Sequence, residues 1–260
     1  MFKKPPLYLS IVIPAYNEEK RIEACLKKIY EFMKTQNYLY EVIISDDGSK
    51  DETRDIVKRY QEYWPNLVLL ENPHKGKAPT IISGIYKASA KYSLFTDVDL
   101  SVPIDELPKM LTWVEDHGFD ISIATREGVG AKRINEPNTR HIMGRVFNML
   151  VQAVVLPGIN DTQCGFKLFK TDAIWHIFQH TKLYGIKNKE ITGGKVSAFD
   201  VEILFVARRL GYKIKEVPVT WYYADGSKVH SIKDSYYNAK DVFRVRLYSW
   251  LNAYPRNPHK

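Results

Sequence analysis

The sequence predicts an α/β protein built on a mostly parallel sheet flanked by helices. Apolar strand-like runs alternate with helical patterns through the first half of the chain, and three of these runs end in clusters of acidic and small polar residues. Alternating strands and helices are typical of a parallel sheet with right-handed crossovers. Ligands bind beyond the carboxyl ends of strands in open sheets of this kind, so we expect the three clusters to meet in one cleft.

The expected strands are short apolar runs, and they lie at 8–16, 40–49, 66–73, 92–99, 119–125 and 213–223, with a short strand after a turn within 157–170. The expected helices have apolar residues three and four positions apart. They lie at 17–36, 51–64, 78–90, around 107–114, and at 145–155 and 198–212. Asp51 is expected to cap the second helix and Gly211 to end the last one.

Composition is typical of a globular protein with one large domain. The chain has 260 residues and a formal charge of +8, which favours an anionic partner. It carries no common nucleic-acid motif, and no apolar run approaches the ~20 residues of a membrane span. We expect the two cysteines to be reduced thiols, as in a cytosolic protein. We interpret the apolar N-terminal run as a strand rather than a signal peptide.

The third cluster, "FTDVDLSVP", has the residues of a cation site. Asp97 and Asp99 lie one residue apart, with Ser101 behind them. In an extended segment both carboxylates would point the same way, with Val98 toward the core. Oxygen ligands of this kind suit Mg²⁺ or Mn²⁺, whose remaining ligands often come from substrate phosphates. Such a cation would neutralise a diphosphate leaving group.

Several longer motifs resemble one enzyme family. "IVIPAYNEE", "VIISDDGSKDET" and "FTDVDLSVP" resemble the nucleotide-sugar domain of family 2 glycosyltransferases, which have the GT-A fold, a Rossmann-like, mostly parallel sheet. "INDTQCGFKLF", "AFDVEIL" and "EVPVTWYYADGSKV" are similar to the dolichyl-phosphate β-glucosyltransferase branch, close to dolichyl-phosphate mannose synthases. The resemblance implies a catalytic domain at 1–230 and leaves 231–260 as a basic, aromatic C-terminal segment.

The resemblance implies a nucleotide-sugar site at matching positions. Pro14, Tyr16, Glu18 and Asp46 would line the base and ribose, and Asp47 would support that loop.

Further residues of the same site follow the nucleotide toward the sugar. Asp97 would lie near the ribose and the sugar, and Asp99 would bind the metal ion. Ser101 stands where mannose synthases have a glutamine ligand, which is a longer side chain. Lys75 and Lys77 are expected phosphate contacts.

The nature of the nucleophile decides which further residues are needed. By the resemblance, Asp161 and Gln163 would lie over the sugar, and Asp200 and Glu202 would either position the sugar or cap a helix. A sugar hydroxyl as acceptor would require a general base, for which Asp161 and Asp200 are the candidates. A lipid phosphate monoester has a second pKa of about 6 and would attack without one.

An anionic acceptor would in turn require cations. The resemblance assigns Arg126 and Arg140 to the acceptor phosphate, with Lys228 as a further cation at the phosphates. Lys132 and Arg133 are expected to belong to a solvated basic loop.

The sequence thus predicts a metal-dependent, inverting transferase that moves glucose from UDP-glucose to a polyprenyl (dolichyl) phosphate, giving a β-linked product. The alternatives are a GDP-mannose-dependent transferase on the same lipid and a family 2 enzyme acting on a saccharide hydroxyl. A nucleotidyltransferase and a non-catalytic nucleotide-binding module are rivals from other classes.

The expected location is the cytoplasm, on the cytoplasmic face of a membrane. The segment 231–260 mixes aromatic and basic residues, and such a segment binds a membrane interface. An ordinary amphipathic helix or a dimer contact is the alternative for this segment. No nucleic-acid partner is expected, and the oligomeric state is left open.

Overall fold

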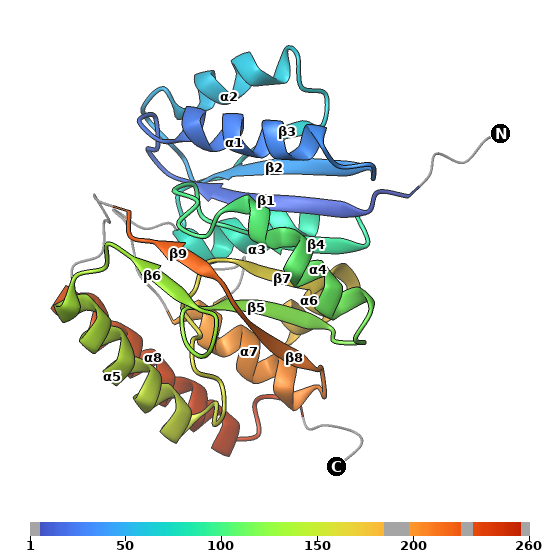
Figure 1. The fold of residues 1–260 in the computed structure, drawn as a ribbon. Coiled ribbons are helices and arrows are strands. Elements are labelled where there is room, and N and C mark those ends of the chain that lie inside the picture. Colours follow the sequence, from blue (N-terminus) through green and yellow to red (C-terminus); the bar gives the residue numbers. More distant parts are fainter. Residues whose placement is uncertain (1–5, 185–197, 225–230, 256–260) are drawn as a thin grey trace.

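A computed structural model describes residues 6–184, 198–224 and 231–255, with side chains from residue 236 on in the last range. Its centre is a seven-stranded sheet in the order β3-β2-β1-β4-β7-β5-β8 (Figure 1). These strands are β1 (Leu9–Ala15), β2 (Tyr40–Asp46), β3 (Leu67–Glu71), β4 (Tyr92–Phe95), β5 (Ile121–Thr125), β7 (Lys167–Lys170) and β8 (Ile214–Pro218). Of these seven, β7 alone runs antiparallel to its neighbours.

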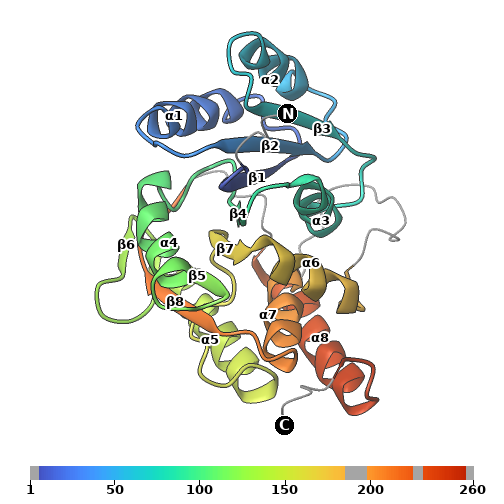
Figure 2. The ribbon, with the colours of Figure 1, turned by 90° about the vertical axis from the view of Figure 1, so that its right-hand side faces the viewer.

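Helices cover both faces of this sheet. They are α1 (Ile22–Lys34), α2 (Thr53–Gln61), α3 (Lys77–Lys87), η1 (Ile104–Glu106), α4 (Leu107–Glu115), α5 (Asn138–Val154), α6 (Thr171–His180), α7 (Phe199–Arg209) and α8 (Ser231–Trp250). Figure 2 shows α1 and α4 on one face and α3 and α6 on the other. Within the described ranges, no helix is both long and apolar enough to cross a membrane.

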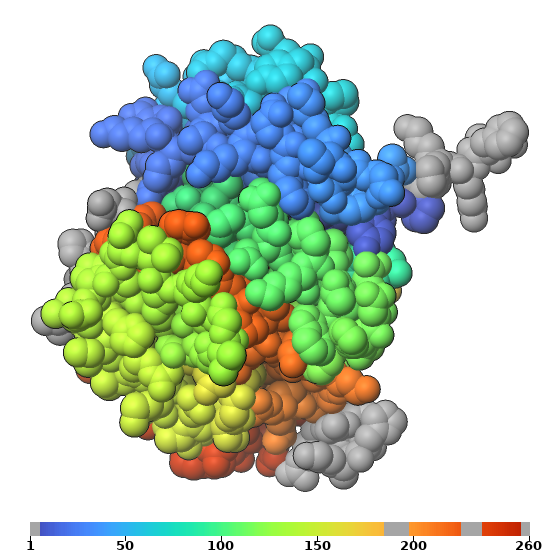
Figure 3. All heavy atoms as spheres, viewed as in Figure 1, coloured from blue at the N-terminus to red at the C-terminus, as the bar shows by residue number. Residues whose placement is uncertain are grey.

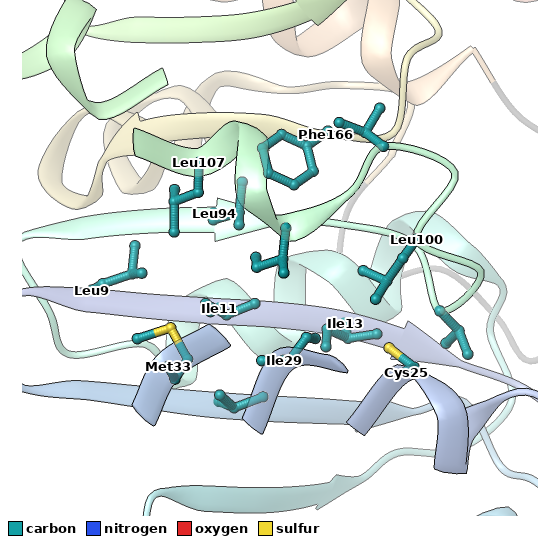
Figure 4. Packing of buried hydrophobic residues seen from close by; sticks show 14 of the residues in the cluster. Leu9, Ile11, Ile13, Cys25, Ile29, Met33, Leu94, Leu100, Leu107 and Phe166 are labelled. Carbon is teal, nitrogen blue, oxygen red and sulfur yellow. The ribbon is translucent and has the colours of Figure 1, made fainter. Parts of the chain in front are cut away.

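The strand β1 separates two apolar cores because its side chains alternate between the faces of the sheet. Leu9, Ile11 and Ile13 are fully buried in the core beneath α1, whereas Val12 belongs to the core on the opposite face. Figure 4 shows the first of these cores from close by, with Ile29 of α1 beside β1. The apolar face predicted for the first helix is buried as expected, at Ile22, Leu26, Ile29 and Met33.

The structure differs from the sequence expectation in the second half of the chain. The expected strand 213–223 is two strands, β8 and β9 (Thr220–Tyr222), because the chain leaves the large sheet after Pro218 and β9 pairs with β6 (Lys132–Ile134). The helix α6 was not expected from the sequence. Gly211 follows the C-cap of α7 with φ of 89°, as predicted.

The cap predicted for the second helix is shifted by one residue. Helix α2 begins at Thr53, so that Glu52 is its N-cap, but the Asp51 carboxylate still accepts the Thr53 amide at 3.0 Å.

The C-terminal helix α8 packs against the rest of the domain. Val242 and Val245 are fully buried in the core that also contains α7. The Tyr254 hydroxyl donates to the fully buried Glu202 carboxylate at 2.7 Å. The described part of the segment 231–260 is thus joined to α7 rather than separate from it.

Candidate active site

A cavity of about 450 Å³ lies at the carboxyl ends of the central strands. Tyr16 follows β1, Asp47 follows β2 and Asp97 follows β4, and all three line it. The three acidic and polar clusters therefore meet in one cavity, as predicted. The side chains on its far side come from loops and helices of the second half of the chain.

The first end of the cavity is built on Asp47. Its carboxylate accepts the backbone amides of Lys75 at 2.8 Å and Gly76 at 2.9 Å, and it pairs with His74 Nδ1 at 2.8 Å. The His74 ring stacks on Tyr16 with centroids 4.1 Å apart and planes 8° apart. Asp47 thus supports the loop at residues 74–76. It also holds His74 in a flat aromatic surface with Tyr16, a role that the sequence did not predict for His74.

Three further residues of the expected nucleotide site have different surroundings. Pro14 and Glu18 line the cavity. Asp46 is fully buried and is not among the described lining residues. One of its oxygens, Oδ2, accepts the amides of Gly48 and Ser49 at 3.0 Å and the Arg54 Nε at 2.6 Å. The structure shows Asp46 holding the turn after β2, and its contact with a nucleotide stays a prediction.

Asp97 and Asp99 lie at the centre of the cavity. The expected extended segment is wrong: the chain makes a turn here, in which the Leu100 amide donates to the Asp97 carbonyl at 3.1 Å. Both carboxylates nevertheless line the cavity, and Val98 is buried as predicted. Lys77 Nζ pairs with Asp97 Oδ1 at 2.5 Å.

The electrostatics of the centre suit a cation. Burial raises the pKa of Asp99, and the negative charge of Asp97 raises it further. Desolvation lowers the pKa of Lys77, but the charges of Asp97, Asp200 and Asp99 and the hydrogen bond to Asp97 together outweigh it, so that the pKa of Lys77 is raised overall. Among the described residues, no three His, Cys, Asp or Glu side chains gather as metal ligands. The carboxylates of Asp97 and Asp99 are oxygen ligands of the kind that Mg²⁺ binds together with substrate phosphates.

Ser101 lies beside this centre. The Ser101 backbone amide donates to Asp99 Oδ1 at 3.0 Å, and Ser101 lines the cavity.

Gly165 is required by the position of Asp97. A Cβ atom at residue 165 would lie 2.0 Å from Asp97 Oδ2. The carboxylate thus packs against the backbone of the loop before β7, and any side chain at this position would displace it. This contact joins the end of β4 to the loop that carries "DTQCGFK".

Asp161 is held in a buried ion pair instead of lying over the cavity. Arg126 binds its carboxylate with two side-chain bonds, Nε to Oδ2 at 2.7 Å and Nη2 to Oδ1 at 2.8 Å. Burial would raise the pKa of Asp161, but the charge of Arg126, its hydrogen bonds and the charge of Lys167 together lower it more, and the net pKa is below its usual value. Asp161 is not among the described lining residues, whereas Gln163 and Arg126 are. The structure shows Asp161 bound to Arg126, and its expected place over the sugar stays a prediction.

Asp200 does line the cavity, and its partner was missed by the sequence reasoning. Lys167 of β7 is fully buried, and its Nζ donates to Asp200 Oδ1 at 2.5 Å and to the Cys164 carbonyl at 2.6 Å. A lysine inside the apolar run "GFKLF" was the available signal. Glu202, in contrast, accepts the amides of Lys182 and Leu183 away from the cavity.

The basic residues divide into two groups. Arg140 of α5 lines the cavity, with its guanidinium over the Tyr223 ring at 5.2 Å from the centroid. Arg133, expected in a solvated loop, instead pairs with Glu127 and Glu136, each at 2.6 Å. Lys228 lies outside the described residues.

Comparison with known families identifies the chain. The family model described as glycosyl transferase family 2 matches residues 10–178. The chain is a family 2 glycosyltransferase. This glycosyltransferase is 32% identical to a dolichyl-phosphate beta-glucosyltransferase of Trichomonas vaginalis, over 98% of this chain and 77% of the relative. It is 33% identical to one of Dictyostelium discoideum, over 93% and 74%. The resemblance to this branch is confirmed.

Solved structures confirm the fold of the glycosyltransferase. Glucosyl-3-phosphoglycerate synthase of Mycobacterium tuberculosis, in complex with Mn²⁺ and UDP, superposes with a TM-score of 0.64 at 15% identity, covering 94% of this chain and 79% of that one. A mannosyltransferase of Pyrobaculum calidifontis with GDP-Man and Mn²⁺ gives 0.57 at 21% identity, covering 99% and 70%. The fold is GT-A.

Gly165→Ala is expected to reduce glycosyl transfer by about 100-fold, because its Cβ displaces the Asp97 carboxylate from Lys77 and small misplacements at a reacting centre have effects of this size. The variant should still fold, since the carboxylate end can move. Steady-state transfer rates and thermal unfolding measure the two effects. Gly144→Ala is the matched control, because a Cβ there meets nothing within 4 Å. Full activity of Gly165→Ala would refute the role given to this contact.

Proposed function

We propose that the enzyme transfers glucose from UDP-glucose to a polyprenyl (dolichyl) phosphate in a metal-dependent reaction that inverts the anomeric centre. The observation that supports this most strongly concerns the two candidate general bases. Asp161 is paired with Arg126, and Asp200 is paired with the buried Lys167. A carboxylate already paired with a cation is a weak proton acceptor. The site is therefore better suited to an acceptor that carries its own negative charge.

A lipid phosphate monoester has this property. Its second pKa of about 6 leaves it largely dianionic at neutral pH. Arg140 lines the cavity and would provide positive charge for it, and Arg126, whose charge is shared with Asp161, would add N–H donors beside it. A phosphate oxygen forms a bond to the anomeric carbon from the side opposite the diphosphate. The bond from that carbon to the diphosphate oxygen breaks, and its electron pair leaves with UDP. Attack on this side turns an α-linked donor into a β-linked product.

The opposite end of the cavity suits the donor nucleotide. The Tyr16–His74 stack offers a flat face to a base, and Asp47 holds the loop that carries His74. Lys77 lines the cavity beside Asp97 and would contact the diphosphate. Asp99, with Asp97 and Ser101 beside it, would hold Mg²⁺ or Mn²⁺, which supplies positive charge to the leaving diphosphate. The names of the relatives support glucose as the sugar, and the Mycobacterium tuberculosis synthase was solved with UDP.

A lipid acceptor would bring the enzyme to a membrane, and two helices provide a surface for it. On α5, Ile142, Val146 and Met149 are more than half exposed and lie on one face, at spacings of four and three residues. The neighbouring helix α8 exposes Phe243 and Trp250 to the same extent. Figure 1 shows these two helices side by side, and Figure 3 shows α5 forming a continuous part of the surface.

The same two helices reach the cavity. Arg140 of α5 and Asn238 of α8 both line it, a few residues before the exposed apolar positions begin. An acceptor phosphate in the cavity could therefore be attached to a prenyl chain in the bilayer. We infer peripheral binding, on the cytoplasmic face, through these helices.

The transfer itself is tested by lipid extraction. Purified enzyme, Mn²⁺ or Mg²⁺ and a short polyprenyl phosphate are mixed with radiolabelled UDP-glucose or, separately, GDP-mannose. We expect label from UDP-glucose in the organic phase, and a loss of about 100-fold or more in Asp99→Asn, because the cation would lose its carboxylate. Asp105→Asn, an exposed position outside the cavity lining, is the control. Transfer only from GDP-mannose would keep the mechanism and change the donor, and transfer to a saccharide alone would refute the lipid acceptor.

Membrane contact is tested separately by co-sedimentation with anionic liposomes. The double variant Val146→Ser/Phe243→Ser is expected to bind about tenfold or more weakly, because each substitution removes an apolar side chain that would enter the interface. Tyr63→Ser, a position of equal exposure to Phe243 but distant from α5 and α8, should bind like the wild type. Unchanged binding of the double variant would rule out this surface.

A further inference from the structure

Two amide groups in the cavity wall are buried without partners. Asn238 is only 9% exposed, and its Oδ1 has no hydrogen-bond partner in the described structure. The Nε2 of Gln163 is likewise buried with no partner there. Both residues line the cavity. Buried polar atoms in folded proteins are nearly always paired, and leaving one unpaired is unfavourable, so these two atoms point to a ligand.

Asn238 is fixed beside the start of α7. One helical turn further along α8, Asp241 pairs with the Tyr184 hydroxyl, whose oxygen accepts the Ala198 amide at 3.1 Å. Ala198 is the N-cap of α7, and the cavity-lining Asp200 is in the first turn of that helix. Asn238 therefore lies on the part of the cavity wall formed by α8 and the start of α7.

Gln163 belongs to the loop before β7 that packs against Asp97. Its backbone amide donates to Asp161 Oδ1 at 3.2 Å, which ties it to the buried Arg126 pair. Two residues later, Gly165 packs against the Asp97 carboxylate. Gln163 therefore borders the centre where a donor diphosphate and its sugar are joined.

The chemistry of the two atoms selects the ligand. The Gln163 Nε2 donates hydrogen bonds, whereas the Asn238 Oδ1 accepts them. A phosphate dianion only accepts, so it does not satisfy Asn238. A hydroxyl group does both, and a hexose carries several of them on neighbouring carbons. A hexose therefore carries the kind of group that each of the two amide atoms lacks.

We propose that Asn238 of α8, together with Gln163, reads the hydroxyl groups of the transferred hexose. This assignment rests on the proposed function and adds α8 to the donor site. Asn238 Oδ1 accepts a hydrogen bond from one hydroxyl, and Gln163 Nε2 donates to another. A site that hydrogen-bonds a hydroxyl discriminates strongly against a sugar that lacks it or presents it elsewhere. Asn238 is thus a specificity-determining residue for the sugar.

Calorimetric titration separates the hexose from the nucleotide. Wild type, Asn238→Leu and Asn238→Asp are titrated with UDP-glucose and with UDP, both in the presence of Mn²⁺. Asn238→Leu is expected to bind UDP-glucose about three- to tenfold more weakly while its affinity for UDP changes less than about twofold, because UDP has no hexose. Asn238→Asp keeps an acceptor oxygen and is expected to retain more of the UDP-glucose affinity.

The control variant is Asn148→Leu. The Asn148 Oδ1 on α5 is also buried without a partner in the described structure, but Asn148 is not among the described lining residues. It is therefore expected to leave both affinities unchanged. If Asn148→Leu weakens the binding of UDP-glucose relative to UDP as much as Asn238→Leu does, the effect is structural and the proposal is overturned.

Each other outcome is equally decisive. If Asn238→Leu weakens the binding of UDP and of UDP-glucose equally, the hexose contact is overturned. If it changes neither affinity, the contact is also overturned, and the Asn238 oxygen binds only a water molecule. A change confined to the KM for polyprenyl phosphate assigns Asn238 to the acceptor and also overturns it. If the wild type binds UDP-glucose no better than UDP, the titrations are repeated with GDP-mannose and GDP, and the two affinities are compared in the same way. A wild type that binds none of these nucleotide sugars contradicts the proposed function, before any variant is compared.

Discussion

The carboxylate of Asp97 lies where the two ends of the cavity meet, and its surroundings leave it little freedom. On one side it pairs with Lys77 at 2.5 Å, and on the other it packs against the backbone of Gly165. Strands β4 and β7 pair directly, so this contact joins the nucleotide half of the sheet to the half that carries α7. The positions of Asp99 and Gln163 both depend on it, since each is two residues from one of the contacting groups.

The distribution of charge around this centre explains what the cavity accepts. Two ion pairs lie at this site, Arg126 with Asp161 and Lys167 with Asp200. In each pair the carboxylate already has a cationic partner. Paired charges of this kind are costly to bury and are stabilised by multiple hydrogen bonds, which here also join the loop before β7 to the end of β5 and β7 to the start of α7. Arg140 adds positive charge at the cavity wall. An anionic nucleophile is therefore compatible with the site without a proton acceptor.

The sequence predicted the location of the site better than the direction of its side chains. Alternating apolar patterns located β1, β2, β4 and β5, and the rule about strand ends brought Tyr16, Asp47 and Asp97 together correctly. The same rule did not tell which carboxylates turn inward. Asp46 follows the strand-end pattern as Asp47 does, but backbone amides and Arg54 bind one of its carboxylate oxygens. Asp161, which only the family resemblance brought to the site, is bound by Arg126. Lys167 gave a signal that was overlooked, a lysine inside an apolar run. Asn238 could not be predicted, because its position depends on how α8 packs, and this is set by distant contacts such as Tyr184 with Asp241.

The central claim is that the charge of the nucleophile comes from the acceptor and not from a protein base. It is tested most directly by the pH dependence of kcat/KM for two acceptors, a polyprenyl phosphate and the corresponding polyprenyl phosphonate, whose second pKa is higher. The account predicts that the acidic limb of the profile moves to higher pH with the phosphonate, because that limb reports the ionisation of the free acceptor. An acidic limb at the same pH for both acceptors would contradict the account and assign the ionisation to the enzyme.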